Sequence, residues 1–302
     1  MKSEMILLRS MMFVPGHHEN LYESATKSTA DALIFDLEDS VQPPSNKPLA
    51  RKIIIKNLEN PLFNRFKKFV RLNEIETEFF LQDVIEVTNA KVDGFLLSKT
   101  NTAKDIYYLD NLLTSIERER NLEIGKFKII PILESAQSII NIQEIAVASN
   151  RIIALGFGSE DYVSDIQGVR DFDTNMSINY PRSLVPIVAR AHKLEAIDAA
   201  YIKVHDLDGL KKHLEIGKIL GYGGMWVLHP KQNDLVNEVY SPTIKEYEDA
   251  KNFLRLYEEA QKMNKGVAIV EGKFVGPPLI TKSKDIIARA ELIALKEDRY
   301  KS

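Results

Sequence analysis

Charged side chains gather at the ends of several short apolar runs in this sequence. Glu134 directly follows the run 128–133, and Asp161 comes shortly after the next run, 152–157. If these runs form neighbouring parallel strands, about 4.8 Å apart, the two carboxylates can share one small cation. Magnesium typically takes one or two protein carboxylates and completes its shell with water and substrate. Glu134 and Asp161 therefore predict a Mg²⁺ site, to which a 2-oxo or 2-hydroxy carboxylate would bind as a bidentate ligand.

A purely structural interpretation stays open for each of these carboxylates. Glu134 could cap the helix that follows it, and Asp161 could pair with a lysine. A zinc site is disfavoured, because the chain has 6 histidines and no cysteine. The magnesium interpretation is favoured because both acids stand at matching strand ends, with Arg71 two strands away.

A second group of candidates surrounds Arg71. Because a guanidinium can bind a carboxylate through two parallel hydrogen bonds, Arg71 is predicted to bind a substrate carboxylate; a surface arginine is the alternative. Asp36, Glu38 and Asp39 form the densest acidic cluster, at the end of another apolar run. We assign Asp36 and Glu38, together with Arg71, to catalysis. At least one of the three acids is expected to point outward, since three bare carboxylates would repel one another.

A glycine-containing turn spans residues 156–159. Small residues there let backbone N–H groups approach a ligand, although a glycine turn alone is a weak signal. Gly158 and Ser159 are therefore predicted to bind substrate, together with Arg71 and Glu134.

Histidines also stand near the ends of two apolar runs. His17 and His18 follow the first run, but adjacent histidines cannot easily both face a site, so a loop role is favoured. His229 follows the eighth run, and a role in capping the helix that starts near Lys231 is favoured. None of the three is assigned to catalysis.

The elements that must position these groups follow a regular alternation. Eight apolar, β-branched runs are separated by segments that are mostly long enough for a helix, several of them with helical periodicity. Strands that alternate with helical crossovers indicate a parallel sheet, and solid apolar runs indicate strands covered on both faces. Eight strands predict an α/β fold, a (β/α)8 TIM barrel, with a doubly wound open sheet as the alternative. The predicted strands are 10–14, 32–36, 69–72, 94–97, 128–133, 152–157, 197–202 and 225–228.

The C-terminal part departs from this repeat. We predict the barrel over residues 1–240, and helices with an extended arm over residues 241–302. Ser241 and Pro242 are suited to start a helix that reaches about residue 263. A short hairpin is expected over 266–275 and a last helix over 278–295. Elements after a complete barrel are expected here to serve oligomerisation or to cover the active site.

Composition excludes several classes of protein. The chain has 302 residues, of which 44% are apolar, and a formal net charge of −3, so no nucleic-acid partner is indicated. The absence of cysteine excludes disulfides, thiolate metal sites and a thiol nucleophile. No run approaches the 18 apolar residues of a membrane span, and the N-terminal run 5–8 is too short for a signal peptide. We expect a cytoplasmic protein without membrane partners.

Taken in order, the motifs resemble those of one enzyme family. The sequence is similar to the citrate lyase beta subunit and its relatives in the HpcH/HpaI aldolase superfamily, including malyl-CoA lyases. The likeness runs from Arg9 to about Ala290. The motifs that carry it are 9–16 (RSMMFVPG), 30–41 (ADALIFDLEDSV), 70–73 (VRLN), 131–136 (PILESA), 157–161 (FGSED), 196–198 (AID) and 229–232 (HPKQ).

The resemblance implies a (β/α)8 barrel, Mg²⁺, and a homotrimer or hexamer that could join other citrate lyase subunits. It assigns metal binding to the positions of Glu134 and Asp161, and substrate binding to those of Arg71 and Glu134. Many relatives that cleave thioesters also carry an aspartate in a C-terminal Gly-x-x-hydrophobic-Asp-x-Pro pattern. Here Gly276 stands in its place. Lys203, expected directly after the seventh strand, also stands where relatives often have an acid.

Three functions follow from the resemblance. The first is Mg²⁺-dependent cleavage of a citryl-type thioester, on CoA or an acyl carrier protein, into oxaloacetate and an acetyl thioester. The second is a malyl- or citramalyl-CoA lyase. The third is a catalytically weakened subunit that binds a 2-oxo acid, which Gly276 and Lys203 motivate.

Overall fold

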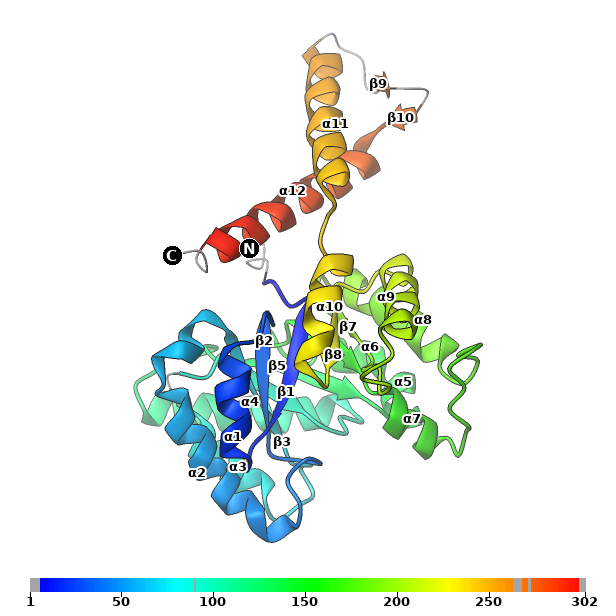
Figure 1. Ribbon diagram of the computed structural model, residues 1–302. Coiled ribbons are helices and arrows are strands. Elements are labelled where there is room, and N and C mark those ends of the chain that lie inside the picture. The colour runs from blue at the N-terminus through cyan, green and yellow to red at the C-terminus, as the bar shows by residue number, and fades with distance from the viewer. Residues whose placement is uncertain (1–5, 90, 263–267, 271–272, 299–302) are drawn as a thin grey trace. The chain divides into compact units, whose positions relative to one another are not determined.

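The computed structural model describes residues 6–89, 91–262, 268–270 and 273–298 (Figure 1). The chain divides into two compact units. One is Leu8–Asn237, and the other combines Met1–Leu7 with Glu238–Ser302.

The first unit is a closed barrel of eight parallel strands that pair in chain order, with β1 closing the ring against β8. The (β/α)8 prediction is therefore confirmed, and the open-sheet alternative is wrong. Almost every strand residue is buried, as expected for strands covered on both faces. The strands are β1 Ser10–Pro15, β2 Ala32–Asp36, β3 Lys67–Leu72, β4 Gly94–Leu97, β5 Lys128–Leu133, β6 Ala154–Phe157, β7 Glu195–Asp198 and β8 Gly224–Val227.

Helices follow the strands around the barrel (Figure 1). The segment 136–148 forms two short helices that meet at Asn141, whose side-chain amide donates to the Asn101 carbonyl at 2.9 Å. The helices are α1 Glu19–Thr26, α2 Lys47–Leu58, α3 Phe80–Val87, α4 Ala103–Glu119, α5 Ala136–Ile140, α6 Ile142–Ala146, α7 Ser159–Asp165, α8 Asn179–Ala191, α9 Leu207–Leu220 and α10 Asn233–Tyr240; three 3₁₀ turns are η1 Pro44–Asn46, η2 Pro61–Arg65 and η3 Pro230–Gln232.

Strand register brings the candidate residues together. Asp36, the last residue of β2, stands directly opposite Arg71 in β3. Leu133 and Phe157, the last residues of β5 and β6, are likewise paired. The residues that follow these two strands therefore leave the sheet side by side, at the end where (β/α)8 enzymes build their sites.

The seventh strand ends earlier than predicted. It covers Glu195–Asp198, whereas the sequence predicted 197–202. The buried Asp198 carboxylate is bound by Arg182 of α8, with Nη2 at 2.5 Å, and also accepts the N–H of Ala199 at 2.9 Å. These contacts turn the chain out of the sheet after Asp198. The prediction that Lys203 directly follows this strand is therefore wrong.

The second unit contains α11 Ile244–Lys262, the short strands β9 Ala268–Val270 and β10 Lys273–Val275, and α12 Pro277–Asp298. The strands pair antiparallel, as the predicted hairpin requires, and the two helices pack together. Thr243 caps α11 instead of Ser241. Its hydroxyl accepts the Glu246 N–H at 3.1 Å, and the Glu246 carboxylate accepts the Thr243 N–H at 2.7 Å, which forms a capping box.

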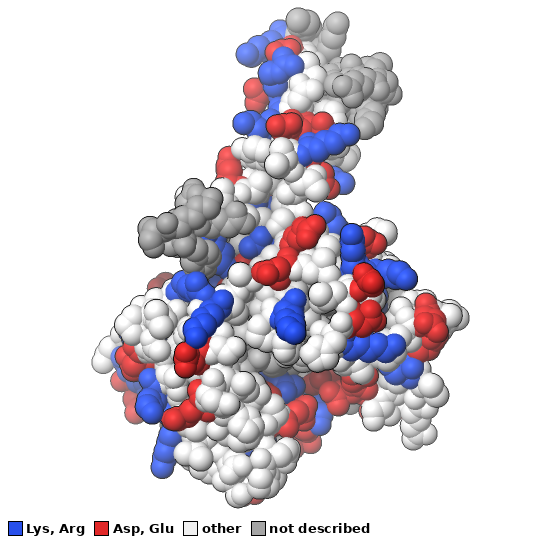
Figure 2. Space-filling model, viewed as in Figure 1, with Lys and Arg blue, Asp and Glu red and all other residues white. Residues whose placement is uncertain are grey.

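Two observations bear on partners of the whole chain. None of the helices that the structure describes has the length and apolar character needed to cross a membrane. On the face shown in Figure 2, basic and acidic side chains are interspersed and form no broad basic surface.

Candidate active site

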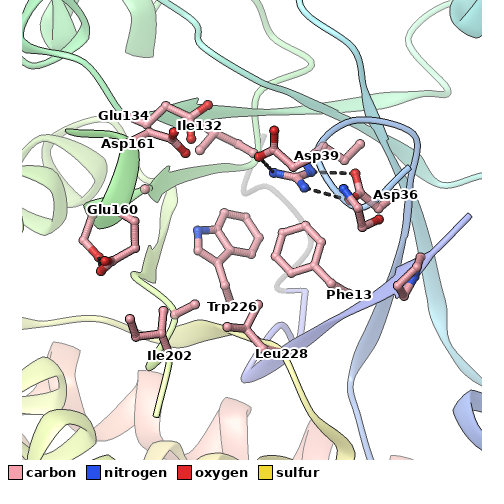
Figure 3. Close-up of a pocket in the computed structure, with 16 residues that line it drawn as sticks. Phe13, Asp36, Asp39, Ile132, Glu134, Glu160, Asp161, Ile202, Trp226 and Leu228 are labelled. Carbon is pink, nitrogen blue, oxygen red and sulfur yellow. Dashed lines mark hydrogen bonds and ion pairs between the residues drawn. The ribbon is translucent and has the colours of Figure 1, made fainter. Parts of the chain in front are cut away.

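A cavity of about 410 Å³ opens at the carboxyl ends of the barrel strands (Figure 3). This is within the usual size of small-molecule sites. Charged groups lie along two of its walls, and apolar side chains form the floor between them. The lining residues are Phe13, Pro15, Asp36, Asp39, Ser40, Arg71, Ile132, Glu134, Gly158, Ser159, Glu160, Asp161, Ala200, Ile202, Trp226 and Leu228.

Glu134 and Asp161 lie next to each other on one wall (Figure 3). Glu134 follows β5, and Asp161 stands in the first turn of α7, after β6. Within the described part of the chain, neither forms an ion pair with a lysine or arginine, unlike the neighbouring Glu160, which pairs with Arg170 at 3.0 Å. No three His, Asp or Glu side chains among the described residues form a metal cage. Two bare carboxylates facing an open cavity are the oxygen donors that Mg²⁺ takes while keeping its remaining positions for water and substrate.

Burial disfavours the ionised form of Glu134. Desolvation, followed by the negative charges of Glu38 and Asp161, raises its pKa to about 8. Two interactions oppose this rise: the backbone N–H of Lys99 donates to Glu134 Oε1 at 2.7 Å, and the positive charge of Arg71 favours the ionised acid. Lys99 stands two residues after the end of β4 and has φ at +46°, in the left-handed region that side chains rarely adopt. This turn aims the N–H at Glu134 and leaves Oε2 to the cavity.

The two glycines of the 156–159 segment make room for side chains. A Cβ at Gly158 would lie 2.7 Å from Glu134 Oε2, and one at Gly156 would lie 2.0 Å from the ring of Trp226. Gly156 belongs to β6 and not to a turn. Gly158 and Ser159 both line the cavity, as their prediction as substrate-binding residues requires.

On the opposite wall, Arg71 is bound by Asp36. Arg71 Nε and Nη2 donate to the two Asp36 oxygens at 2.7 and 2.8 Å. The carboxylate also accepts the backbone N–H groups of Glu38 and Ser40 at 2.9 and 3.1 Å. Although burial favours the protonated acid, Arg71 and these hydrogen bonds hold the pKa of Asp36 below its usual range. Asp36 is therefore an ionised partner that orients Arg71.

Glu38 and Asp39 share the remaining side of Arg71. Arg71 Nη1 lies 2.7 Å from Glu38 Oε2 and 3.4 Å from Asp39 Oδ2. Glu38 is buried behind the guanidinium and does not line the cavity, whereas the largely exposed Asp39 does. Burial raises the pKa of Glu38 to about 7 despite Arg71, and the charge of Asp39 and a hydrogen bond to it add to the rise. Of the three clustered acids, Asp39 is the one that points outward.

A buried polar layer supports this wall. The ammonium of Lys47 donates to the carbonyls of Leu37 and Glu38, each at 3.0 Å, and to the side chain of Asn73. Asn73 Nδ2 in turn donates to Asp83 at 2.6 Å. These bonds fix the loop that carries the acidic cluster, because each buried polar group would be costly to leave without a partner.

The sequence predictions did not include the floor of the cavity. Phe13 of β1 and Trp226 of β8 lie between the two charged walls (Figure 3). Their ring centroids are 6.0 Å apart, and the guanidinium carbon of Arg71 lies 4.8 Å from the centre of the Phe13 ring. A signal was present, since Trp226 is the only tryptophan of the chain and stands in an apolar run that ends at the barrel mouth.

The histidines and Lys203 stay outside the cavity lining. The ring centroids of His17 and His18 lie 3.8 Å apart with the rings tilted by 39°, and His229 Nδ1 accepts the Lys231 N–H at 3.2 Å, as the capping role predicted. The exposed Lys203 places its ammonium 4.5 Å from the centre of the Phe172 ring.

A model of the HpcH/HpaI aldolase/citrate lyase family matches residues 9–230, which include every strand of the barrel. The chain belongs to this family. Among its HpcH/HpaI relatives, the citrate lyase subunit beta of Haemophilus influenzae is 32% identical over 287 residues, covering 95% of this chain and 98% of the relative. The (3S)-malyl-CoA thioesterase of Cereibacter sphaeroides is also 32% identical, over 286 residues and 95% of each chain.

Solved structures of two mycobacterial proteins share the fold. CitE of Mycobacterium tuberculosis, solved with magnesium, acetoacetate and coenzyme A, is 22% identical with a TM-score of 0.74, and the match covers 93% of this chain and 97% of that one. The citrate lyase beta subunit of the same organism, solved with oxaloacetate and magnesium, gives 24% identity and a TM-score of 0.65 over 78% and 99% of the two chains.

Proposed function

We propose that this protein is a magnesium-dependent carbon–carbon lyase that cleaves a 3-carboxy-3-hydroxyacyl thioester into a 2-oxo acid and a shorter acyl thioester. The supporting observation is the pair Glu134 and Asp161, two carboxylates without a cationic partner among the described residues, which face a cavity whose opposite wall holds Arg71. A cation at the first wall and a guanidinium at the second suit a substrate with charged oxygens at both ends.

Glu134 and Asp161 would hold the Mg²⁺, with Lys99 N–H fixing one oxygen of Glu134. When bound there, the ion supplies a Lewis acid that stabilises negative charge developing on a substrate oxygen. Both carboxylates provide the hard oxygen donors that this ion prefers, and magnesium is present in the mycobacterial relatives.

Arg71 would bind a substrate carboxylate, and Asp36 would be its positioning residue. Asp36 uses two of the guanidinium N–H groups and Glu38 lies 2.7 Å from Nη1, so a substrate carboxylate would take the place of the exposed Asp39, which lies 3.4 Å from Nη1. A fixed, preoriented cation stabilises charge without the reorganisation that water would need.

Cleavage removes a proton from the substrate hydroxyl and returns one to the enolate carbon of the departing thioester. We assign this transfer to Glu38, because a pKa of about 7 lets one carboxyl both accept and donate near neutral pH. Its route to the cavity would be Asp39, which shares Arg71 Nη1 with Glu38 and lines the cavity.

A citryl thioester, giving oxaloacetate and an acetyl thioester, is the first substrate that we propose, because several relatives at 31–32% identity are citrate lyase beta subunits. A malyl- or citramalyl-CoA thioester is the second. The malyl-CoA thioesterase relatives add hydrolysis of the thioester as a possible outcome for the second substrate class.

The weakened-subunit interpretation loses one of its two supports, since Lys203 does not follow the seventh strand directly. The other support, Gly276, remains; it is a buried residue between β10 and α12. If Gly276 lowers activity, Gly276→Asp should raise the rate with CoA thioesters by orders of magnitude, and robust turnover by the unmodified protein would exclude a binding-only role.

One assay tests the proposal directly. The purified protein is incubated with Mg²⁺ and citryl, malyl or citramalyl thioesters, each on CoA and on an acyl carrier protein, with EDTA as the control. Release of a 2-oxo acid identifies the lyase, and release of the intact hydroxy acid identifies a thioesterase. No product from any thioester would refute the proposal.

We also propose a homotrimer or hexamer in which residues 241–302 contribute to assembly or cover the site. Light scattering of the purified protein and of a chain ending at residue 240 tests this assignment. A monomeric full-length chain would contradict it.

A further inference from the structure

The floor of the cavity lies on the path between its two charged walls. Glu134 and Asp161 stand on one side (Figure 3), and Asp36, which binds Arg71 through two hydrogen bonds, stands on the other. Phe13 and Trp226 line the same cavity as both walls, so the carbon skeleton of a bound ligand lies against their rings. Aliphatic groups gain free energy from burial on such apolar surfaces, whereas a charge there would lack a partner.

Trp226 cannot move aside easily. Its side chain is 3% exposed, its Nε1–H donates to the Phe157 carbonyl at 3.0 Å, and its ring occupies the space that a Cβ at Gly156 would fill. Phe13 packs against it from β1 and is covered on another side by Arg71. A side chain held by both packing and a hydrogen bond forms a rigid wall, because protein interiors leave little free volume for a shift.

We propose that Trp226 is the specificity-determining residue of this site and that its indole ring limits the size of the substituent on the 2-oxo acid. The inference rests on the proposed function. Acids with a short, unbranched substituent, such as methyl or ethyl, pass over the ring, and acids with a branched substituent collide with it. Trp226 touches the substrate skeleton and takes no part in proton transfer.

The test compares 2-oxo acids of increasing bulk. Binding of pyruvate, 2-oxobutanoate and 3-methyl-2-oxobutanoate to the full-length protein with Mg²⁺ is measured by calorimetry. One methylene in an apolar pocket typically changes affinity by about 10- to 200-fold. The unmodified protein should therefore bind the branched acid at least about tenfold more weakly than pyruvate. Trp226→Leu should remove most of this difference.

Phe95→Leu is the matched control. Phe95 of β4 is fully buried, packs on Phe127 and does not line the cavity. This substitution removes a buried ring from the same barrel, so it should lower stability and leave the ratio of the two affinities unchanged. Trp226→Phe, which removes less volume, gives the same comparison with a smaller effect if Trp226→Leu does not fold.

The single tryptophan provides a second measurement. Because Trp226 is the only tryptophan of the chain, a ligand on the floor changes all of the tryptophan emission of the protein. Pyruvate with Mg²⁺ should alter this emission in the unmodified protein and in Phe95→Leu. Binding seen by calorimetry without any change in emission would overturn the inference.

The outcomes separate the inference from the function on which it rests. If folded Trp226→Leu keeps the original preference for pyruvate over the branched acid, the size limit is refuted and the lyase proposal stands. If the unmodified protein binds no 2-oxo acid with Mg²⁺, both are refuted. Loss of the preference in Phe95→Leu would also count against Trp226 as its source.

Discussion

Asp36 and Glu134 occupy comparable places on opposite walls of the cavity, at the carboxyl ends of β2 and β5, with 1% and 5% of their surface exposed. Yet the pKa of Asp36 is lowered, and that of Glu134 is raised to about 8. Desolvation acts on both and favours the protonated acid in each case. The difference comes from the surrounding charges, since Asp36 binds a guanidinium, whereas the negative charges of Glu38 and Asp161 each act on Glu134 more strongly than the positive charge of Arg71.

The comparison shows how one barrel rim can hold two kinds of acid. The paired acid at β2 is satisfied and fixes the orientation of Arg71, whereas the bare acids at β5 and β6 lack the positive charge that would balance them. A divalent cation would supply that charge. Substitutions on one wall at a time test this difference.

The largest effect is expected for Asp161→Asn on the bare wall. The amide cannot provide an anionic ligand, so Mg²⁺-dependent binding of oxaloacetate should fall by more than the 10- to 100-fold typical of outer-shell changes. Calorimetry measures the affinity, and circular dichroism should show an unchanged fold. Asp208→Asn, on the exposed first turn of α9, is the control. If the affinity of Asp161→Asn is unchanged, Asp161 is not a ligand of the metal.

Asp36→Asn weakens the paired wall. Removing one partner of a buried ion pair leaves the other charge uncompensated, which costs roughly 3–5 kcal/mol. We expect a loss of free energy of unfolding in this range, measured by urea denaturation, together with a raised KM. An Asp36→Asn protein as stable as the original would show that Arg71 finds equal compensation from Glu38 and Asp39.

Mg²⁺ affinity and the stability of the fold should both depend on pH through Glu134. Because Glu134 must lose its proton to bind a cation, Mg²⁺ affinity should rise by up to about tenfold per pH unit below pH 8 and level off above it. Without metal, the raised pKa of Glu134 stabilises the fold fully below about pH 4.5, and this contribution disappears as pH rises through 8.

Denaturation at pH 6 and pH 9 in EDTA measures that loss. Glu134→Gln should reduce the difference between the two pH values without abolishing it, because Glu38, with a pKa of about 7, acts in the same direction. An affinity for Mg²⁺ that does not change with pH would contradict the assignment of Glu134 as a ligand.

The smallest effect is expected for Gly158→Ala. The added Cβ would lie 2.7 Å from Glu134 Cβ and Oε2, so the carboxylate must shift away from its present position. We expect Mg²⁺ affinity to fall about tenfold, the lower end for changes that act through a ligand's support. Gly168→Ala, where the nearest atom to an added Cβ is 3.2 Å away on the flexible side chain of Ile166, is the comparison.

Much of the fold could be predicted because buried parallel strands leave solid apolar runs in the sequence. The seventh strand was misplaced for the same reason. Residues 199–202 are apolar enough for a strand, but Arg182 binds Asp198 and ends the sheet. No local pattern reveals a contact with a side chain from the preceding helix.

The candidate site, too, could be predicted only in part. The sequence pointed to Glu134 and Asp161 from their positions after two successive apolar runs, and the structure places both on one cavity wall. The ion pair between Arg71 and Asp36 depends on the register of β3 against β2. A shift of that register by one residue would change it. The single tryptophan at the end of an apolar run was a signal for the floor, but its fit against a glycine in β6, far away in the sequence, could not be predicted.

The bond from Lys99 to Glu134 comes from the main chain and not from a side chain. Any residue that tolerates a left-handed backbone, glycine and asparagine above all, can therefore replace Lys99 without deleting the donor. Among homologous sequences, position 99 should consequently vary in chemical type while keeping its backbone shape. A comparison of residue identities alone would overlook an atom that orients the glutamate.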